Sequence, residues 1–255
     1  MIFSRCIVRE PCPEMVGGLT NAGLGLPDFT LAKIQHKAYV EALRTCGCTA
    51  ISLAAEPQYP DSVFVEDTAL LIIGELAILS RPGAESRRGE TALMKPVLEE
   101  FFPVIEVIKA PGTLDAGDVL EAGQHYFIGL SKRTNAKGAE QLIHILEKHG
   151  KTGSTISLKK FLHLKTGVAY LGNNSVLLAG ELKHCPAFAD FIRFEVDDDE
   201  EYAANSIMLN GTLLMPAGYP KILDKLVRSG YHIIQVDTSE FQKLDGGISC
   251  LSLRF

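Results

Sequence analysis

The sequence lacks a long apolar run, an excess of basic residues and a low-complexity linker. Its formal net charge is -6, so no positive field is present to gather the phosphates of a nucleic acid. No segment reaches the roughly 20 apolar residues that a membrane span requires, and residues 1–20 contain no signal-peptide core. We therefore expect a soluble, cytoplasmic protein with a small-molecule substrate and no nucleic-acid or membrane partner. The oligomeric state stays open, a homodimer included.

A paired cysteine framework is also missing. The cysteines are scattered along a chain that is too large to depend on disulfides, so we expect free thiols. Cys250 differs from the others because Gly246 and Gly247 shortly precede it and let the backbone approach a ligand closely. Taken by itself, it fits a buried inert thiol as well as a nucleophile.

Helical periodicity is clearest over residues 28–46, and weaker patterns cover residues 90–102, 134–149 and 220–229. In the first helix Asp28 is the expected N-cap, and Gly47 follows the end. Its expected core face contains Leu31, Ile34, Ala38, Ala42 and Leu43. Short β pairs lie between the helices, joined by turns such as that at residues 210–211. One α/β domain spanning residues 1–255 follows from this pattern.

A polar residue stands just before each β pair or terminal strand. These residues recur at a spacing of roughly 40 to 50 residues, which is typical of a repeated unit of strands plus a helix. They are Asp67, Asp118, His163, Asn205 and Cys250. Units arranged about an axis would bring them to one end of a central channel. If the N-terminal strand (residues 2–8) and the C-terminal strand (residues 248–255) share one unit, the ring closes and hides its sheet edges.

These residue types suit an attack on a guanidinium carbon. A thiolate is a strong nucleophile, and a cationic substrate lowers the pKa of the thiol from which it forms. An imidazole can protonate the departing amine and then deprotonate water. Carboxylates opposite a guanidinium accept its paired N–H donors. Each residue alone also has an ordinary structural interpretation, His163 as a strand-start histidine and Asp115 as a turn residue.

Six segments together resemble the motifs of one family, in order and in approximate spacing. They are residues 61–67, 81–88, 113–118, 131–135, 163–167 and 245–250. Through them nearly the whole chain resembles the dimethylarginine dimethylaminohydrolases, which belong to a guanidine-modifying superfamily with arginine deiminases and amidinotransferases. The resemblance implies a five-bladed β/α propeller of the pentein type. It also implies hydrolysis of methylated arginines to citrulline and a methylamine, through a covalent thiouronium intermediate, without metal or organic cofactor.

The resemblance also implies roles for individual residues. Cys250 is the nucleophile, His163 the acid and base, and Asp115 their acidic partner, although some relatives carry Glu at that position. The expected substrate contacts are Asp61, Glu66 and Asp67 at the guanidine and amine ends, Arg87 and Arg133 at the carboxylate, Phe64 in the pocket, and Leu19 and Leu244 partly through their backbones.

Two other functions remain open from the sequence. An arginine deiminase would use the same fold and nucleophile on unmethylated arginine, and it would differ in the pocket around Phe64 and in a flap near residues 17–26. A non-catalytic arginine-binding propeller is the alternative from another class. An intact Cys250 with His163 favours an enzyme.

Overall fold

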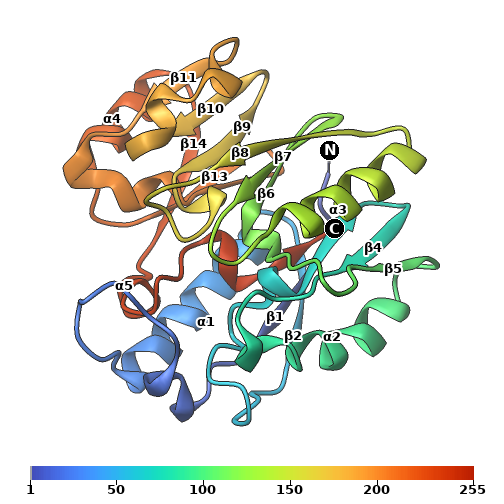
Figure 1. The fold of residues 1–255 in the computed structure, drawn as a ribbon. Helices are drawn as coiled ribbons and strands as arrows, with labels where there is room; N and C mark the ends of the chain where they lie inside the picture. The colour runs from blue at the N-terminus through green and yellow to red at the C-terminus, as the bar shows by residue number, and fades with distance from the viewer. Residues whose placement is uncertain (1) are drawn as a thin grey trace.

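The computed structural model describes residues 2–255, whose strands form five three-stranded sheets (Figure 1). In each sheet the first and second strands pair antiparallel, and the third strand pairs parallel with the second. The first strands are β3 (Ala69–Ile72), β6 (Val119–Ala122), β9 (Val168–Gly172), β12 (Ile207–Leu209) and β15 (Leu253–Arg254). The second strands are β4 (Leu76–Leu79), β7 (His125–Leu130), β10 (Ser175–Leu178), β13 (Thr212–Pro216) and β1 (Arg5–Arg9). The third strands are β5 (Ile105–Val107), β8 (Thr152–Ser157), β11 (Ile192–Glu195), β14 (His232–Val236) and β2 (Thr49–Leu53).

A helical crossover joins the second strand to the third in every sheet, as a parallel connection requires. The crossovers are α1 (Phe29–Thr45), α2 (Glu90–Glu99), α3 (Ala136–Lys148), α4 (Pro220–Arg228) and, between β10 and β11, the 3-10 helices η6 (Gly180–His184) and η7 (Pro186–Phe188). The predicted α-helices are therefore confirmed, whereas the third strands were not expected because they are short and flank the stronger helical patterns. Within residues 2–255 no helix is both long and apolar enough to cross a membrane.

Helix α1 begins as predicted, since the carboxylate of Asp28 accepts the N–H groups of Thr30 and Leu31. The predicted core face was wrong for most of its length. Ile34 is 61% exposed, whereas the buried residues of α1 are Ala32, Gln35, His36, Tyr39, Val40, Ala42 and Leu43. A second stripe of the helix, containing the polar Gln35 and His36, faces the core because those side chains pack against residues 234–244.

The hairpin between β12 and β13 shows how local sequence sets the turns. Asn210 and Gly211 both have positive φ, 50° and 85°, which matches the right-handed twist of the paired strands. The Asn210 side chain also holds the N-terminal segment, since its Oδ1 accepts the N–H of Phe3 at 2.8 Å and its Nδ2 donates to the Phe3 carbonyl. The predicted turn therefore also ties two distant parts of the chain together.

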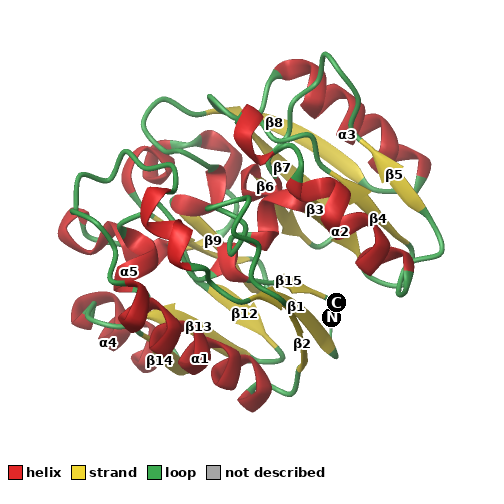
Figure 2. Ribbon diagram, turned by 90° about the horizontal axis from the view of Figure 1, so that it is seen from below, coloured by secondary structure: helices red, strands yellow, loops and turns green. Residues whose placement is uncertain are grey.

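The two ends of the chain share one sheet, as predicted. Cys6 of β1 pairs with Arg254 of β15, and the termini lie side by side (Figure 2). The predicted C-terminal strand, residues 248–255, was wrong for its first half, because residues 249–251 form the 3-10 helix η9 (Ser249–Leu251). A similar 3-10 helix, η2 (Val65–Thr68), leads into β3. Only the end of the C-terminal segment continues as a strand.

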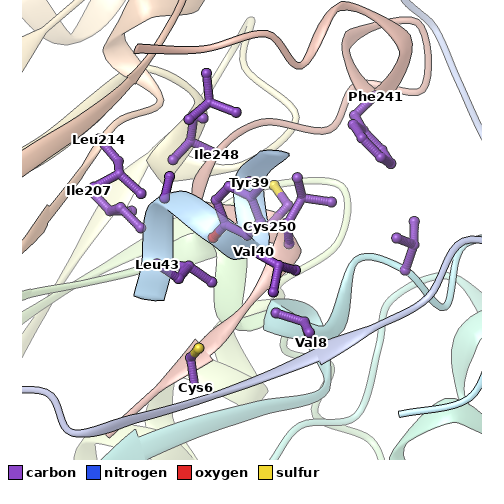
Figure 3. Packing of buried hydrophobic residues seen from close by; sticks show 14 of the residues in the cluster. Cys6, Val8, Tyr39, Val40, Leu43, Ile207, Leu214, Phe241, Ile248 and Cys250 are labelled. Atoms are coloured by element: carbon purple, nitrogen blue, oxygen red, sulfur yellow. The ribbon is translucent and has the colours of Figure 1, made fainter. Parts of the chain in front are cut away.

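The largest apolar cluster packs α1 against this shared sheet and against β12 and β13. It contains Tyr39 and Leu43 of α1 together with Cys6 and Cys250 (Figure 3). All six cysteines are free thiols, as predicted. The cluster fixes the segment that contains Cys250, because full burial of one such aliphatic or aromatic side chain stabilises the fold by about 1.5–3 kcal/mol.

Candidate active site

A 3-10 helix precedes the first strand of every sheet. These helices are η2, η4 (Ala116–Asp118), η5 (Leu164–Thr166), η8 (Asp198–Ala204) and η9. The five recurring polar residues lie in these helices or at their ends: Asp67 in η2, Asp118 in η4, His163 before η5, Asn205 after η8 and Cys250 in η9. Helix η2 packs against both η9 and η4, while η5 packs against η4 and η8. The predicted convergence of these positions is confirmed.

His163 and Asp115 form a buried pair. The Nε2 of His163 lies 3.0 Å from Oδ2 of Asp115, and the other carboxylate oxygen accepts the N–H of Gly83 at 2.8 Å. Burial alone would raise the pKa of Asp115, but the hydrogen bond and charge of His163 lower it below the usual value. Asp115 is therefore an anion that fixes the orientation of the imidazole. Its role as the acidic partner in catalysis stays a prediction.

Asp67 faces the opposite nitrogen of the imidazole. Its Oδ1 accepts the N–H of Gly117 at 3.1 Å and lies 3.9 Å from Nδ1 of His163. Burial would lower the pKa of His163, but Asp67 and Asp115 raise it to about 9. The resting imidazole is consequently protonated at neutral pH, which is the state required of a proton donor.

Cys250 lies in the nucleophile loop, residues 245–250, and is 7% exposed. Its Sγ accepts the N–H of Gly247 at 3.4 Å. Burial raises the pKa of its thiol to about 12, and the negative charges of Glu66 and Asp67 act in the same direction. The free protein therefore holds a neutral thiol, and a cation placed beside Asp67 favours the thiolate.

The two glycines of the nucleophile loop are required because any side chain at these positions would clash with its neighbours. A Cβ on Gly246 would enter the ring of Phe64, and one on Gly247 would enter the side-chain amide of Asn205. Phe64 in turn packs edge-to-face on Phe241, with 6.2 Å between the ring centroids. The predicted close approach of backbone in this loop is thus directed at neighbouring side chains of the protein.

Asp61 and Glu66 differ in what their carboxylates contact. Asp61 is buried and accepts the N–H of Leu19 at 2.9 Å. Glu66 is already bound by Lys165 at 2.7 Å and by Arg254 at 2.9 Å. A substrate contact through Glu66 stays a prediction, and both of its cationic neighbours would compete with it.

The two predicted carboxylate-binding arginines also differ. The guanidinium of Arg87 is buried and already binds Asp67 and Glu90 as well as the carbonyl of Phe64. The side chain of Arg133 is 15% exposed, with Nη1 at 3.9 Å from Oδ2 of Asp115. Arg133 thus retains free donors beside the catalytic pair, whereas Arg87 mainly organises the acids around it.

The segment expected to form a flap lies over the nucleophile loop. The hydroxyl of Thr20 donates to the Lys243 carbonyl at 2.7 Å, and the N–H of Asn21 donates to Asp245 at 2.6 Å. Leu19 is 41% exposed, while Leu244 is buried beneath Gly18. These contacts bring both predicted backbone contacts, at residues 19 and 244, to one side of the site.

A cavity of about 950 Å³ adjoins the site. It is lined on one side by Asn21 and Leu24 of the flap and on another by Asn205 and Gly247, next to the nucleophile. Such a volume is in the range of small-molecule sites, which run to about 1,000 Å³. The cavity therefore borders the loop that contains Cys250 and is large enough for a small molecule.

Three of these side chains are arranged closely enough to hold a cation. The ligand atoms of Asp67, Asp115 and His163 all lie within 4.8 Å of one another. A metal there would have to displace the proton of an imidazole whose pKa is raised to about 9. We therefore keep the expectation that the reaction uses no metal.

Several residues shape the site although no role in it was predicted for them beyond the convergence of the repeat. Asp118 accepts the N–H of Leu164 and the hydroxyl of Ser131, which fixes the segment that follows His163, and burial raises its pKa to about 6. Its place in the repeat was the available signal. Ser249 and Gly117 gave no local signal, because a buried serine or a glycine that lies near a site only after folding looks ordinary in sequence.

Gly117 offers a direct test of this geometry. A Cβ there would lie 2.7 Å from Oδ1 of Asp67 and 2.8 Å from Nδ1 of His163, so Gly117→Ala should push the two groups apart. We expect kcat to fall by roughly 100-fold, since a displacement of about 1 Å can have that effect. Gly74→Ala, in a hairpin turn where a Cβ meets open space, is the control: its positive φ of 75° makes the substitution cost stability, but it should leave kcat unchanged. Equal activities of the two variants in a steady-state assay would contradict the arrangement.

Comparison with known proteins places this geometry among related chains. Residues 50–212 match the model of the arginine deiminase family. The chain is 51% identical to the N(G),N(G)-dimethylarginine dimethylaminohydrolase of Pseudomonas aeruginosa, over 100% of both chains. It is 38% identical to the enzyme of the same name from Streptomyces coelicolor, over 100% of this chain and 98% of the other.

Solved structures agree with the sequence comparison. A cysteine-to-serine mutant of the Pseudomonas aeruginosa enzyme complexed with citrulline matches with a TM-score of 0.98 and 50% identity, over 100% of both chains. A dimethylarginine dimethylaminohydrolase in which histidine is replaced by glycine, captured as an adduct with S-methyl-L-thiocitrulline, matches with a TM-score of 0.97 at the same identity and coverage.

Proposed function

Since this chain belongs to the dimethylarginine dimethylaminohydrolase family, we propose that it hydrolyses Nω-methylated arginines to citrulline and a methylamine. It is a hydrolase that acts on the C–N bonds of linear amidines, and the reaction passes through a covalent thiouronium on Cys250. The observation that carries this proposal is the joint placement of the Cys250 loop and the His163–Asp115 pair around Asp67.

In the first half of the reaction the guanidinium binds beside Asp67, and the thiol proton leaves to solvent. The thiolate of Cys250 adds to the guanidinium carbon, forming the S–C bond. The C–N bond to the methylated nitrogen then breaks while protonated His163 gives its proton to that nitrogen. A methylamine departs and the thiouronium remains.

In the second half the neutral His163 takes a proton from water. The water oxygen adds to the same carbon and the S–C bond breaks. As the carbonyl of citrulline forms, the remaining proton of the added oxygen passes to the departing thiolate, which restores the neutral thiol of Cys250, and citrulline leaves. Asp115 stabilises the imidazolium that reforms, since its carboxylate is 3.0 Å from Nε2. The enzyme returns to its starting protonation state without a cofactor.

We propose that the same residues make the contacts with the substrate. Asp67 pairs with the guanidinium, and Asp61 binds the amine end together with the backbones of residues 19 and 244. Arg133 binds the carboxylate of the substrate. Arg87 contributes indirectly, because it holds Asp67 in place. Phe64 forms the wall against which the methyl groups lie.

We also propose that the five sheets are the blades of a closed propeller and that residues 1–255 form one catalytic domain. The support is a second cavity of about 490 Å³, lined by residues from the first strand of all five sheets, such as Ala69, Leu120, Tyr170, Met208 and Leu253. A cavity shared in this way is expected at the axis of a ring. The pairing of β1 with β15 closes the ring at the chain ends.

For the whole protein we propose a cytoplasmic location and a homodimer. The outward stripe of α1, with Leu31 and Ile34 exposed, is an apolar surface on which a second copy can pack. Sedimentation of the purified protein tests the dimer, and fractionation of cells tests the location.

The function is tested by incubating the purified protein with arginine, monomethylarginine and dimethylarginine and measuring citrulline. We expect citrulline from both methylated substrates, at a rate that a chelator leaves unchanged. Turnover of arginine alone would indicate an arginine deiminase, and tight binding without turnover would indicate a binding protein. Loss of activity on chelation, restored by one metal, would contradict the metal-free mechanism.

A further inference from the structure

Ser249, the residue before the nucleophile, has all three of its polar groups held by other parts of the chain. Its N–H donates to Oδ1 of Asn205 at 2.8 Å, and its carbonyl accepts from Nη1 of Arg254 at 3.0 Å. Its hydroxyl donates to Oε2 of Glu66 at 2.7 Å. We call Ser249 and these three partners the Ser249 clamp. The clamp fixes the backbone at the point where the Cys250 side chain begins.

The partners in the clamp come from three different segments of the fold. Asn205 follows η8, Glu66 lies in η2, and Arg254 lies in β15. The clamp therefore forms only when these separate units have assembled. A nucleophile held in this way is placed by the tertiary structure of several units and is independent of the local preference of its own loop.

Glu66 is the charged centre of the clamp. Burial alone would raise the pKa of its carboxylate, but Lys165 and Arg254 lower it, so Glu66 is an anion. A hydroxyl bond to an ionised acceptor is short and strong compared with a bond between neutral groups. The hydroxyl of Ser249 is therefore firmly oriented, and it lies 3.9 Å from Sγ of Cys250.

The hydroxyl bond of the clamp borders a different cavity from the one beside the flap. Glu66, Lys165, Ser249 and Arg254 all line the smaller cavity on the proposed propeller axis. Among the described residues, that cavity shares no lining residue with the larger one beside the flap. Ser249 and Glu66 therefore border the cavity on the proposed axis, whereas Asn205 of the clamp lines the larger cavity beside the flap.

We infer that Ser249 is a positioning residue whose hydroxyl bond to Glu66 holds Sγ of Cys250 in line with the guanidinium carbon, so that Glu66 acts on the nucleophile and not on the substrate. The inference rests on the proposed function, since it concerns the attack by Cys250. Removing the hydroxyl leaves the two backbone bonds of Ser249 in place. The loop should then keep its backbone conformation but lose the hydrogen bond that holds the thiol of Cys250 in position.

The test is Ser249→Ala compared with Ser252→Ala. Ser252 is a matched control because it lies in the same segment, is also fully buried and also accepts from Arg254, yet it does not adjoin the nucleophile. We expect Ser249→Ala to lower kcat by roughly 10- to 100-fold with little change in KM, as a small displacement of a reacting group does. Ser252→Ala should keep kcat within about threefold and lower only the melting temperature, by roughly 2–4 °C.

A second readout does not depend on turnover. Alkylation of Cys250 by iodoacetamide, followed on its peptide by mass spectrometry across pH, reports the reactivity and access of the thiol. The single proton of the Ser249 hydroxyl is donated to Glu66, so the hydroxyl holds Sγ in position and does not donate to it. The alkylation rate should therefore rise at each pH in Ser249→Ala, where the thiol is less restrained, and stay at the wild-type value in Ser252→Ala. This measurement decides the inference even if the wild-type protein forms no citrulline from any arginine.

Two outcomes would overturn the positioning role. One is a kcat and an alkylation profile in Ser249→Ala that match the wild type. The other is an equal loss in Ser249→Ala and Ser252→Ala, which would show a general effect of the segment. If Ser249→Ala does not fold, Glu66→Gln, which removes the ionised acceptor of the Ser249 hydroxyl, takes its place with the same two readouts, and a lower kcat at a little-changed KM is again expected.

Discussion

Replacing Cys250 with serine is expected to abolish citrulline formation, with a fall in kcat of more than about a thousandfold. A serine hydroxyl is far less ionised than a thiol, and here burial and the charges of Glu66 and Asp67 oppose ionisation further. Serine nearly preserves the shape of the buried side chain, so the fold should remain intact. Citrulline release and the melting temperature, measured on the same preparation, separate these two effects.

A matched control is Cys185→Ser, because Cys185 is also a free thiol but is half-buried in another unit. This variant should keep the wild-type rate. Near-normal activity of Cys250→Ser would contradict covalent catalysis at this residue. The raised pKa of Cys250, about 12, also means that the thiol needs the arriving guanidinium in order to ionise at neutral pH.

Replacing His163 with glycine is expected to trap the thiouronium on Cys250. The first half needs a thiolate and a proton that the amine can obtain in part from water, whereas the second half needs a base to activate water, for which the site offers no comparable substitute. Mass spectrometry of the intact variant after mixing with substrate, at mildly acidic to neutral pH, should therefore show the adduct. Overall turnover should fall by about a hundredfold or more.

The control for this experiment is the double variant Cys250→Ser with His163→Gly, which should form no adduct. If the single variant forms none and still releases citrulline at the wild-type rate, His163 has only a structural role.

The wild-type enzyme adds a pH test of the same assignment. Because Asp67 and Asp115 raise the pKa of His163 to about 9, the proton donor is present below that pH, and activity should decline as the pH rises through it.

The structure changes the interpretation of two of the predicted substrate contacts. Arg87 and Glu66 were both expected to bind substrate, and each is already paired with opposite charges within the protein, so these contacts stay predictions. A sequence motif shows that a charged residue is needed at a position, but it does not show which way the side chain points. Direction depends on partners such as Glu90 and Lys165, which are supplied by other turns of the chain.

The sequence by itself determined the parts of this protein that depend on local signals. The cap at Asp28 and the turn at residues 210–211 act within a few residues, so the helices and the hairpins were predictable. The spacing of the polar residues before the first strands also indicated that distant groups would meet at one end.

Only the tertiary structure decided the features that depend on distant partners. The stripe of α1 that is buried, with His36 inward and Ile34 outward, follows from the segment packed against it, because helical periodicity permits more than one face. The short third strands form because a neighbouring strand supplies their hydrogen bonds. The hold of Asn205, Glu66 and Arg254 on Ser249 requires three separate units to meet, and no local pattern encodes such a meeting.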